Sequence, residues 1–169
     1  MNEDKESSIS QRKEELSKKY NIDFDKLEKE QLALAKELII EDKIDFSLIE
    51  TFGAIENIFI KNKILSCIIV CNKDFEIIDQ AYTFEKVRFP YFPGFRAYRE
   101  LPAMIQAYEK LNEKPDIIFI AAQGIIHPRL GLASHFGLSV YTPTIGVSQS
   151  LVNIETESID GKDIINQNK

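Results

Sequence analysis

The sequence is poor in residues that cross-link a chain, ligate metal or break regular structure. Its 169 residues include two Cys, two His, six Pro and seven Gly. We expect no Cys/His zinc set to be assembled from the two cysteines and two histidines. So few Pro and Gly exclude a fibrous or low-complexity chain. Cys67 and Cys71 lie in an apolar run, and we expect both to be buried in a strand and unpaired, in a reducing cytoplasm.

Long apolar segments are also missing. No apolar run approaches the roughly 20 residues that a membrane-spanning helix needs. Residues 1–10 are charged where a signal peptide would be apolar. We therefore predict neither a membrane protein nor a secreted one. A hydrophobic content of 44% and a charged content of 28% are typical of one globular domain.

The charge is unevenly distributed along the chain. The formal net charge is -6, and residues 1–50 carry 9 Lys and Arg against 14 Asp and Glu. Residues 51–150 are nearly balanced, with 10 basic and 9 acidic side chains. A protein that binds nucleic acid through a broad positive surface has a different balance. Any contact with nucleic acid is therefore expected to be local and to depend on a few residues.

Helical periodicity characterises the N-terminal part. Residues 1–22 form a polar, charged segment, and Asp23 is placed to cap a following helix. One stripe at helical spacing then predicts that this helix lies on a larger body. The stripe comprises Leu27, Gln31, Leu34, Ala35, Leu38 and Ile39.

The period changes after residue 50. Three runs rich in Ile, Val and Phe, at 52–60, 64–71 and 75–84, are separated by short polar breaks. This pattern predicts an antiparallel meander of three strands. A helix over 97–111 is expected next, with Pro102 tolerated only in its first turn.

The remaining segments predict two more strands around a short helix. Residues 116–121 and 144–147 are typical of strands buried on both faces, and the helix at 130–136 is expected to end at Gly137. Three antiparallel strands followed by helix, strand, helix and strand make the element order of a ribonuclease-H-like α/β domain with a mixed sheet. We predict this domain over residues 23–150, preceded by a helical N-terminal segment and followed by a polar tail over 151–169.

Two loops hold more functional residue types than a scaffold needs. In the first, Pro90 and Pro93 stiffen a loop that carries Tyr91 and Phe92, and Arg99 follows it. A rigid aromatic loop beside cations suits stacking on bases or wedging between them. The alternative is that the aromatic residues close one end of the core.

The second loop follows the predicted strand at 116–121, which is the usual ligand position in α/β sheets. Gly124 would let a flat ligand approach the backbone closely. His127 and Arg129 offer a proton-transfer or phosphate-binding pair. The alternative is that His127, beside Pro128, fixes the turn by a hydrogen bond.

Taken together, these segments resemble endonuclease V, the family that nicks nucleic acid beside deaminated purines. The resemblance spans residues 25–150 and is carried by linked motifs in the family's order. They are Tyr91/Pro93/Gly94/Arg99/Glu100, Gln123/Gly124/His127/Pro128/Arg129, Gly131/Ala133/Ser134/His135/Gly137 and residues 143–147.

The resemblance implies a partner, DNA or RNA with a deaminated base such as inosine. Residues 90–93 correspond to the wedge that holds strands apart, and the residues after it would surround a flipped base. The residues expected to contact nucleic acid are Pro90, Tyr91, Phe92, Pro93, Gly94, Arg96, Arg99, Ala122, Gln123, Gly124 and Arg129.

The resemblance also implies Mg²⁺ or Mn²⁺, held by carboxylates for phosphodiester cleavage. Glu56 and Glu100 match two acidic ligand positions, and His127 is the third candidate catalytic residue. The third acidic position falls on Ala121, which has no oxygen to offer, and a family lysine falls on Gln149. The chain also resembles a divergent member of the family with a short C-terminal part. We therefore expect a degenerate metal site.

Three functions stay open at this point. The first is a protein that binds inosine-containing DNA or RNA with weak or absent cleavage. The second is an active nuclease in which Glu56 and Glu100 hold the metal ion together with His127 or with a relocated acid such as Glu76 or Asp79. The third is a catalytically inactive protein that self-associates or binds a protein partner through an uncovered apolar sheet face.

Overall fold

The N-terminal part is helical, as predicted. The structure, a computed structural model, describes residues 3–41, 44–148, 156–159 and 162–165. Its first elements are the helices α1 (Glu3–Tyr20) and α2 (Phe24–Leu34), followed by the 3₁₀ helices η1 (Ala35–Glu37) and η2 (Phe46–Leu48).

Asp23 caps α2, because its side chain accepts a hydrogen bond from the backbone N–H of Lys26 at 2.9 Å. The predicted stripe holds only in part. Gln31 is buried, but the α-helix ends at Leu34 and Ile39 lies 69% exposed beyond it. The chain therefore leaves the body of the domain earlier than the spacing predicts.

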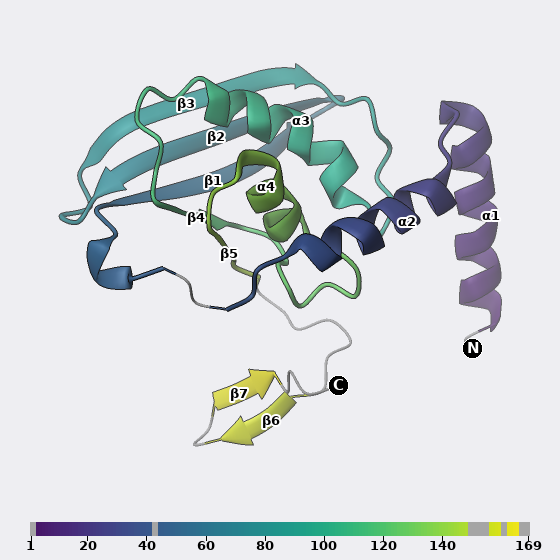
Figure 1. Ribbon diagram of the computed structural model, residues 1–169. Helices are drawn as coiled ribbons and strands as arrows, with labels where there is room; N and C mark the ends of the chain where they lie inside the picture. The colour runs from purple at the N-terminus through teal and green to yellow at the C-terminus, as the bar shows by residue number, and fades with distance from the viewer. Residues whose placement is uncertain (1–2, 42–43, 149–155, 160–161, 166–169) are drawn as a thin grey trace.

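A five-stranded mixed sheet forms the centre of the domain (Figure 1). Its strands are β1 (Thr51–Ile60), β2 (Lys63–Asn72), β3 (Ile77–Lys86), β4 (Ile117–Ile120) and β5 (Thr144–Gly146), in the order β3-β2-β1-β4-β5. β1, β2 and β3 pair antiparallel, whereas β4 pairs parallel with both β1 and β5. The predicted meander and the ribonuclease-H-like arrangement are confirmed.

Helices α3 (Arg96–Glu109) and α4 (Leu132–Val140) pack on the same face of this sheet (Figure 1). The core lies between them and the strands. Every second side chain of β2 points into this core, as expected for a strand with one buried face. The buried core residues are Ile55, Ile68, Val70, Ala97, Leu101, Met104, Ala107, Leu111, Ile118, Ile120, Ala122, Leu132, Ala133 and Phe136.

Two helix predictions were wrong in detail. Pro102 lies within α3, past the first turn, where the helix continues because its apolar face is packed against the sheet. Gly137 lies inside α4, and the helix ends at Tyr141, which adopts a left-handed conformation with φ 54°. A Cβ at Gly137 would come within 2.7 Å of Thr144 Oγ1. The glycine therefore permits close packing of α4 on β5 rather than ending the helix.

The second face of the sheet is open in the part of the chain that the structure describes. Phe119 of β4 is 37% exposed and Ile145 of β5 is 38% exposed, so the prediction that both strands are buried on both faces was wrong. Cys67 is exposed and Cys71 is half-buried, which corrects the expectation that both are buried. The reason is that α3 and α4 cover only the other face.

Beyond β5, the strands β6 (Thr156–Ile159) and β7 (Lys162–Ile165) pair as a separate antiparallel ribbon. This ribbon falls within the stretch expected to be a polar tail. Gln149 lies outside the described residues. Among the described helices, none is long and apolar enough to cross a membrane.

Candidate functional site

The loop between β3 and α3 presents one aromatic ring and buries two others. Tyr91 is 53% exposed, while Phe92 and Phe95 are buried. Both buried rings pack on Phe24 of α2, with ring centroids 4.9 and 5.1 Å apart. The burial of Phe92 and Phe95 agrees with the interpretation that the aromatic residues are part of the packing, whereas stacking of the exposed Tyr91 on a base stays a prediction. Phe92 forms a second buried cluster with Phe24 and Phe95, and this packing fixes the backbone that presents Tyr91, Pro90 and Pro93.

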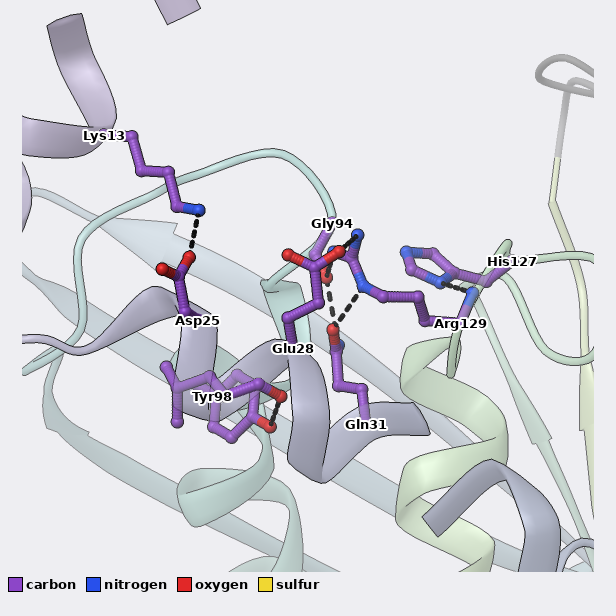
Figure 2. A network of polar contacts seen from close by, with 9 residues as sticks. Lys13, Asp25, Glu28, Gln31, Gly94, Tyr98, His127 and Arg129 are labelled. Carbon is purple, nitrogen blue, oxygen red and sulfur yellow. Dashed lines mark hydrogen bonds and ion pairs between the residues drawn. The ribbon is translucent and has the colours of Figure 1, made fainter. Parts of the chain in front are cut away.

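Arg129 is held inside the protein by a network that joins three segments (Figure 2). Its Nε donates to Gln31 Oε1 at 2.8 Å, its Nη1 to Glu28 Oε1 at 3.1 Å, and its Nη2 to the carbonyl of Gly94 at 3.2 Å. Its guanidinium also lies 4.8 Å from the centre of the Phe95 ring. All these contacts are internal. Arg129 therefore ties α2 to the aromatic loop and has little capacity left for a phosphate.

Gln31 and Gly94 complete this network. Gln31 is 1% exposed, and its Nε2 donates to the carbonyl of Gly94 at 3.0 Å (Figure 2). Gly94 has φ +80°, and a Cβ there would come within 2.5 Å of Arg129 Nη2. A glycine is therefore required, both for the left-handed backbone and for the space.

His127 fixes the turn that carries Arg129. Its Nδ1 accepts a hydrogen bond from the backbone N–H of Arg129 at 3.1 Å. Burial, and secondarily the positive charge of Arg129, lower the pKa of His127. A neutral imidazole with Nδ1 as acceptor carries its proton on Nε2, which can donate to a ligand.

Three of the predicted base-contacting residues meet the catalytic candidate His127 around a small cavity. Gly94, Arg96, Gln123 and His127 line it, and its volume is about 50 Å³. Small-molecule pockets mostly have volumes of ~300–1,000 Å³, so a base would enter only if the lining moved. Ala122 does not line this cavity, because it is 3% exposed in the main core.

Glu100 is buried and fully occupied by protein partners. It is 2% exposed. Arg96 donates to it twice, from Nε at 2.7 Å and from Nη2 at 3.0 Å, and Asn57 donates from Nδ2 at 2.8 Å. The hydrogen bond to Glu100 raises the pKa of the Arg96 guanidinium. The negative charge of Glu100 is therefore neutralised by an arginine of its own helix.

Glu56 lies with Ala121 on the open face of the sheet. Both line a hollow of about 360 Å³ whose other walls are mainly apolar. Glu56 Oε1 accepts a hydrogen bond from the backbone N–H of Asn57 at 2.9 Å. Neighbouring residues of a strand point to opposite faces, and Asn57 reaches Glu100 on the helix-covered face. The structure therefore brings Glu56 and Ala121 together in this hollow, which Glu100 does not line, and the charge of Glu56 contributes to raising the pKa of Arg96, the partner of Glu100.

The residues present do not fit a divalent metal ion. Mg²⁺ prefers several oxygen ligands in near-octahedral geometry, and both carboxylate oxygens of Glu100 are bonded to protein donors. Within the described ranges, no group of three or more His, Cys, Asp or Glu side chains could hold a metal ion. Asp79 and Glu76 do not complete a site at Glu56. Asp79 accepts from the backbone N–H groups of residues 112 and 113, and Glu76 accepts from Asn72 in the β2–β3 turn.

Two residues of the site were missed by sequence reasoning. Gln31 was assigned to a packing stripe, although a polar residue within an apolar stripe was a signal that it has a partner. Asn57 carried no signal, because its contact with Glu100 joins residues 43 positions apart.

Comparison with known proteins gives one consistent result. The family model for endonuclease V matches residues 32–166. Endonuclease V of Dictyoglomus turgidum is 37% identical over 131 residues, which cover 76% of this chain and 57% of that protein. Endonuclease V of Protochlamydia amoebophila is 37% identical over 151 residues, which cover 81% of this chain and 63% of that protein. The chain thus spans less than two thirds of the length of either relative.

Solved structures agree with this result. The crystal structure of endonuclease V from Streptomyces avermitilis superposes with a TM-score of 0.76 at 24% identity, covering 82% of this chain and 63% of that one. The structure of endonuclease V from Ciona intestinalis, in complex with a DNA that contains an inosine, superposes with a TM-score of 0.71 at 26% identity. It covers 78% of this chain and 59% of that one.

Proposed function

This chain belongs to the endonuclease V family, and we propose that it binds inosine-containing nucleic acid without efficiently cleaving it. The binding half of this proposal is supported by Tyr91, which stands exposed on a loop anchored by the buried Phe92. A loop whose backbone is fixed by packing loses little freedom when a base stacks on the ring that it carries. A family relative from Ciona intestinalis binds DNA containing an inosine.

The observation that carries the second half is the occupation of Glu100. A metal ion at Glu100 would have to compete with Arg96 and Asn57 for the carboxylate and would lie beside a guanidinium charge, and removing one partner of a buried ion pair is costly. Ala121 supplies no oxygen beside Glu56. Mg²⁺ or Mn²⁺ binding would therefore be weak, and phosphodiester cleavage weak or absent.

A paired binding and nicking experiment tests this function. Affinity is measured for inosine-containing and guanine-containing strands of DNA and RNA, and nicking of the same strands is followed with Mg²⁺ and with Mn²⁺. We expect preferential binding of the inosine strands without multiple-turnover cleavage. Tyr91→Ala should abolish the preference, and Tyr141→Ala, at a tyrosine that is 95% exposed elsewhere, is the matched control. Robust turnover would refute the proposal.

The open sheet face favours self-association as a second function. Tyr82 is 65% exposed, Ile58 55% and Phe84 47%, and the strand register places Glu56, Cys67 and Tyr82 in one row across three strands. A second copy of the chain would offer the same exposed apolar side chains beside this row, as a two-fold contact requires. Sedimentation equilibrium tests this: a dimer that Tyr82→Glu dissociates would support it, and a monomer at high concentration would exclude it.

A further inference from the structure

Two lysines face each other at one end of the sheet without an acidic partner. Lys63 of β2 and Lys86 of β3 are direct cross-strand neighbours. Like charges placed directly opposite destabilise a strand pair. In the described part of the chain, no carboxylate forms an ion pair with either lysine. The Nζ of Lys63 instead lies 4.8 Å from the centre of the Phe84 ring.

Further cations lie close to this pair. Arg88 is exposed just after β3 and makes no ion pair with any described residue. Arg99 of α3 donates to the carbonyl of Phe89 at 2.8 Å, and its guanidinium lies 4.5 Å from the centre of the Phe59 ring. This concentration of positive charge occurs in a chain with a net charge of -6, so it is a local feature.

Three of these cations, Lys86, Arg88 and Arg99, line a hollow with aromatic walls, which we call the basic hollow. Its volume is about 420 Å³, within the ~300–1,000 Å³ of small-molecule pockets. Its one carboxylate, Glu85, accepts a hydrogen bond from Gln106 at 3.1 Å. The cationic and aromatic residues that line the hollow are Lys86, Arg88, Arg99, Tyr20, Phe89 and Tyr98.

We propose that the basic hollow binds the phosphodiester backbone and a stacked base of a single strand that continues from the aromatic loop. Cations that track phosphates, combined with exposed rings, are the means by which proteins hold single strands without reading their sequence. Phe89 lines the hollow and directly precedes Pro90 of the loop that presents Tyr91, so one strand can reach both. This inference rests on the proposed function, because it extends the same strand beyond Tyr91.

The hollow is partly built by residues outside the family match. Tyr20 and Ile22 line it, whereas the family model begins at residue 32. The end of α1 therefore supplies one wall. This site is expected in this chain and in those relatives whose N-terminal segment is similarly placed.

The test uses a short oligothymidylate without inosine, so that it does not depend on recognition of a deaminated base. Affinity is measured by fluorescence anisotropy over a range of salt concentrations. We expect salt-sensitive binding that Lys86→Ala/Arg88→Ala weakens on the order of tenfold at low salt, with the salt slope falling by roughly 0.7 for each phosphate that the variant no longer neutralises. Lys36→Ala/Lys73→Ala, which removes the same charge away from the hollow, should leave affinity and slope near those of the parent chain.

A second variant probes the aromatic wall. Tyr20→Leu keeps an apolar side chain but removes a stacking surface, and it should weaken oligothymidylate binding without changing the salt slope. Equal affinities for the parent chain, Lys86→Ala/Arg88→Ala and Tyr20→Leu would overturn the inference, as would an absence of oligothymidylate binding. Failure of the proposed function has a different result: oligothymidylate still binds through the hollow, but inosine strands gain no preference.

Discussion

The Nε of Arg96 donates to Oε1 of Glu100 across 2.7 Å, and the two residues lie one turn apart near the start of α3. The pair is asymmetric, because the Arg96 side chain is 44% exposed whereas that of Glu100 is 2% exposed. The arginine reaches inward to neutralise a carboxylate that water cannot solvate. The resemblance to the family implies a metal ion at this carboxylate. In this chain the positive charge of Arg96 pairs with the carboxylate instead.

Replacing Arg96 should therefore destabilise the fold. Arg96→Met leaves the buried Glu100 carboxylate with Asn57 as its remaining partner, and uncompensated buried charges cost about 3–5 kcal/mol. Equilibrium unfolding in urea measures the loss. The double variant Arg96→Met/Glu100→Leu should recover most of it, because both charges are gone. If Arg96→Met alone were as stable as the parent chain, Glu100 would not depend on this ion pair.

Two buried hydroxyl groups in the core should have the opposite effect on stability, because removing them should not destabilise the fold. Ser66 Oγ and Thr83 Oγ1 are buried, are cross-strand neighbours, and have no hydrogen-bond partner among the described residues. A buried polar group without a partner costs about 1–3 kcal/mol. Ser66→Ala and Thr83→Val should therefore leave stability unchanged or raise it by about 1 kcal/mol in urea unfolding.

Thr144→Val is the matched control for these variants. The Thr144 hydroxyl donates to the carbonyl of Ala133 at 2.9 Å. Its removal should lower stability by about 1 kcal/mol. Decreases of similar size at Ser66 and Thr83 would mean that their hydroxyls do have partners in solution.

The internal network at Arg129 makes a third prediction. Gln31 accepts from Arg129 and donates to Gly94, so Gln31→Leu removes both hydrogen bonds at a site that is 1% exposed. The decrease in stability should be about 1–3 kcal/mol, since Arg129 Nε loses its acceptor and the Gly94 carbonyl keeps only the hydrogen bond from Arg129 Nη2. Leu32→Ala, at a neighbouring side chain that is 47% exposed, should cost much less. Equal decreases in urea unfolding would contradict the importance of the network.

The sequence predicts the strands and the main helices because their patterns are local. The apolar run at 64–71 and the helical spacing at 97–111 identify β2 and α3 within a few residues of their observed bounds. The N-cap at Asp23 is equally local. The end of α4 cannot be predicted from a local pattern, because Gly137 serves a contact with Thr144 on another element.

The candidate site was predictable as a set of residues but not as an arrangement. Motif order identifies Tyr91, Glu100 and Arg129, yet it cannot tell which of them face water. That depends on Phe24, Gln31 and Asn57, which reach the site from distant parts of the chain. The open face of the sheet was equally hidden, since an apolar strand looks the same whether one face or both are covered.

Stability should fall as the solution is acidified below neutral pH. Burial lowers the pKa of His135, so the unfolded chain takes up a proton near its ordinary value of about 6.5 before the folded chain does. Between these two pKa values the unfolded state binds more protons, and stability therefore decreases as pH falls. His127 adds a contribution of the same sign.

Urea unfolding at a series of pH values from about 7.5 to 5.5 checks this sign. His135→Gln should reduce the change in the free energy of unfolding with pH. Adding His127→Gln should reduce it further. Carboxylates with lowered pKa values, such as that of Asp116, act only at lower pH. A slope unchanged in both variants would show that neither histidine is held neutral by the fold.

The hollow beside Glu56 offers a direct test of why the metal site fails. Ala121 lines this hollow with Glu56 and is exposed, so Ala121→Asp would place a second carboxylate there without disturbing the core. Two carboxylates attract a divalent cation far more strongly than one, and Mn²⁺ binding measured by calorimetry should become detectable. Ala121→Asn has nearly the same shape without the charge and should bind no better than the parent chain. Glu56→Gln/Ala121→Asp should lose the gain, because binding needs both acids. If Ala121→Asp bound Mn²⁺ no more tightly than Ala121→Asn, the missing carboxylate would not be what limits the site, and the engagement of Glu100 by Arg96 would be the remaining cause.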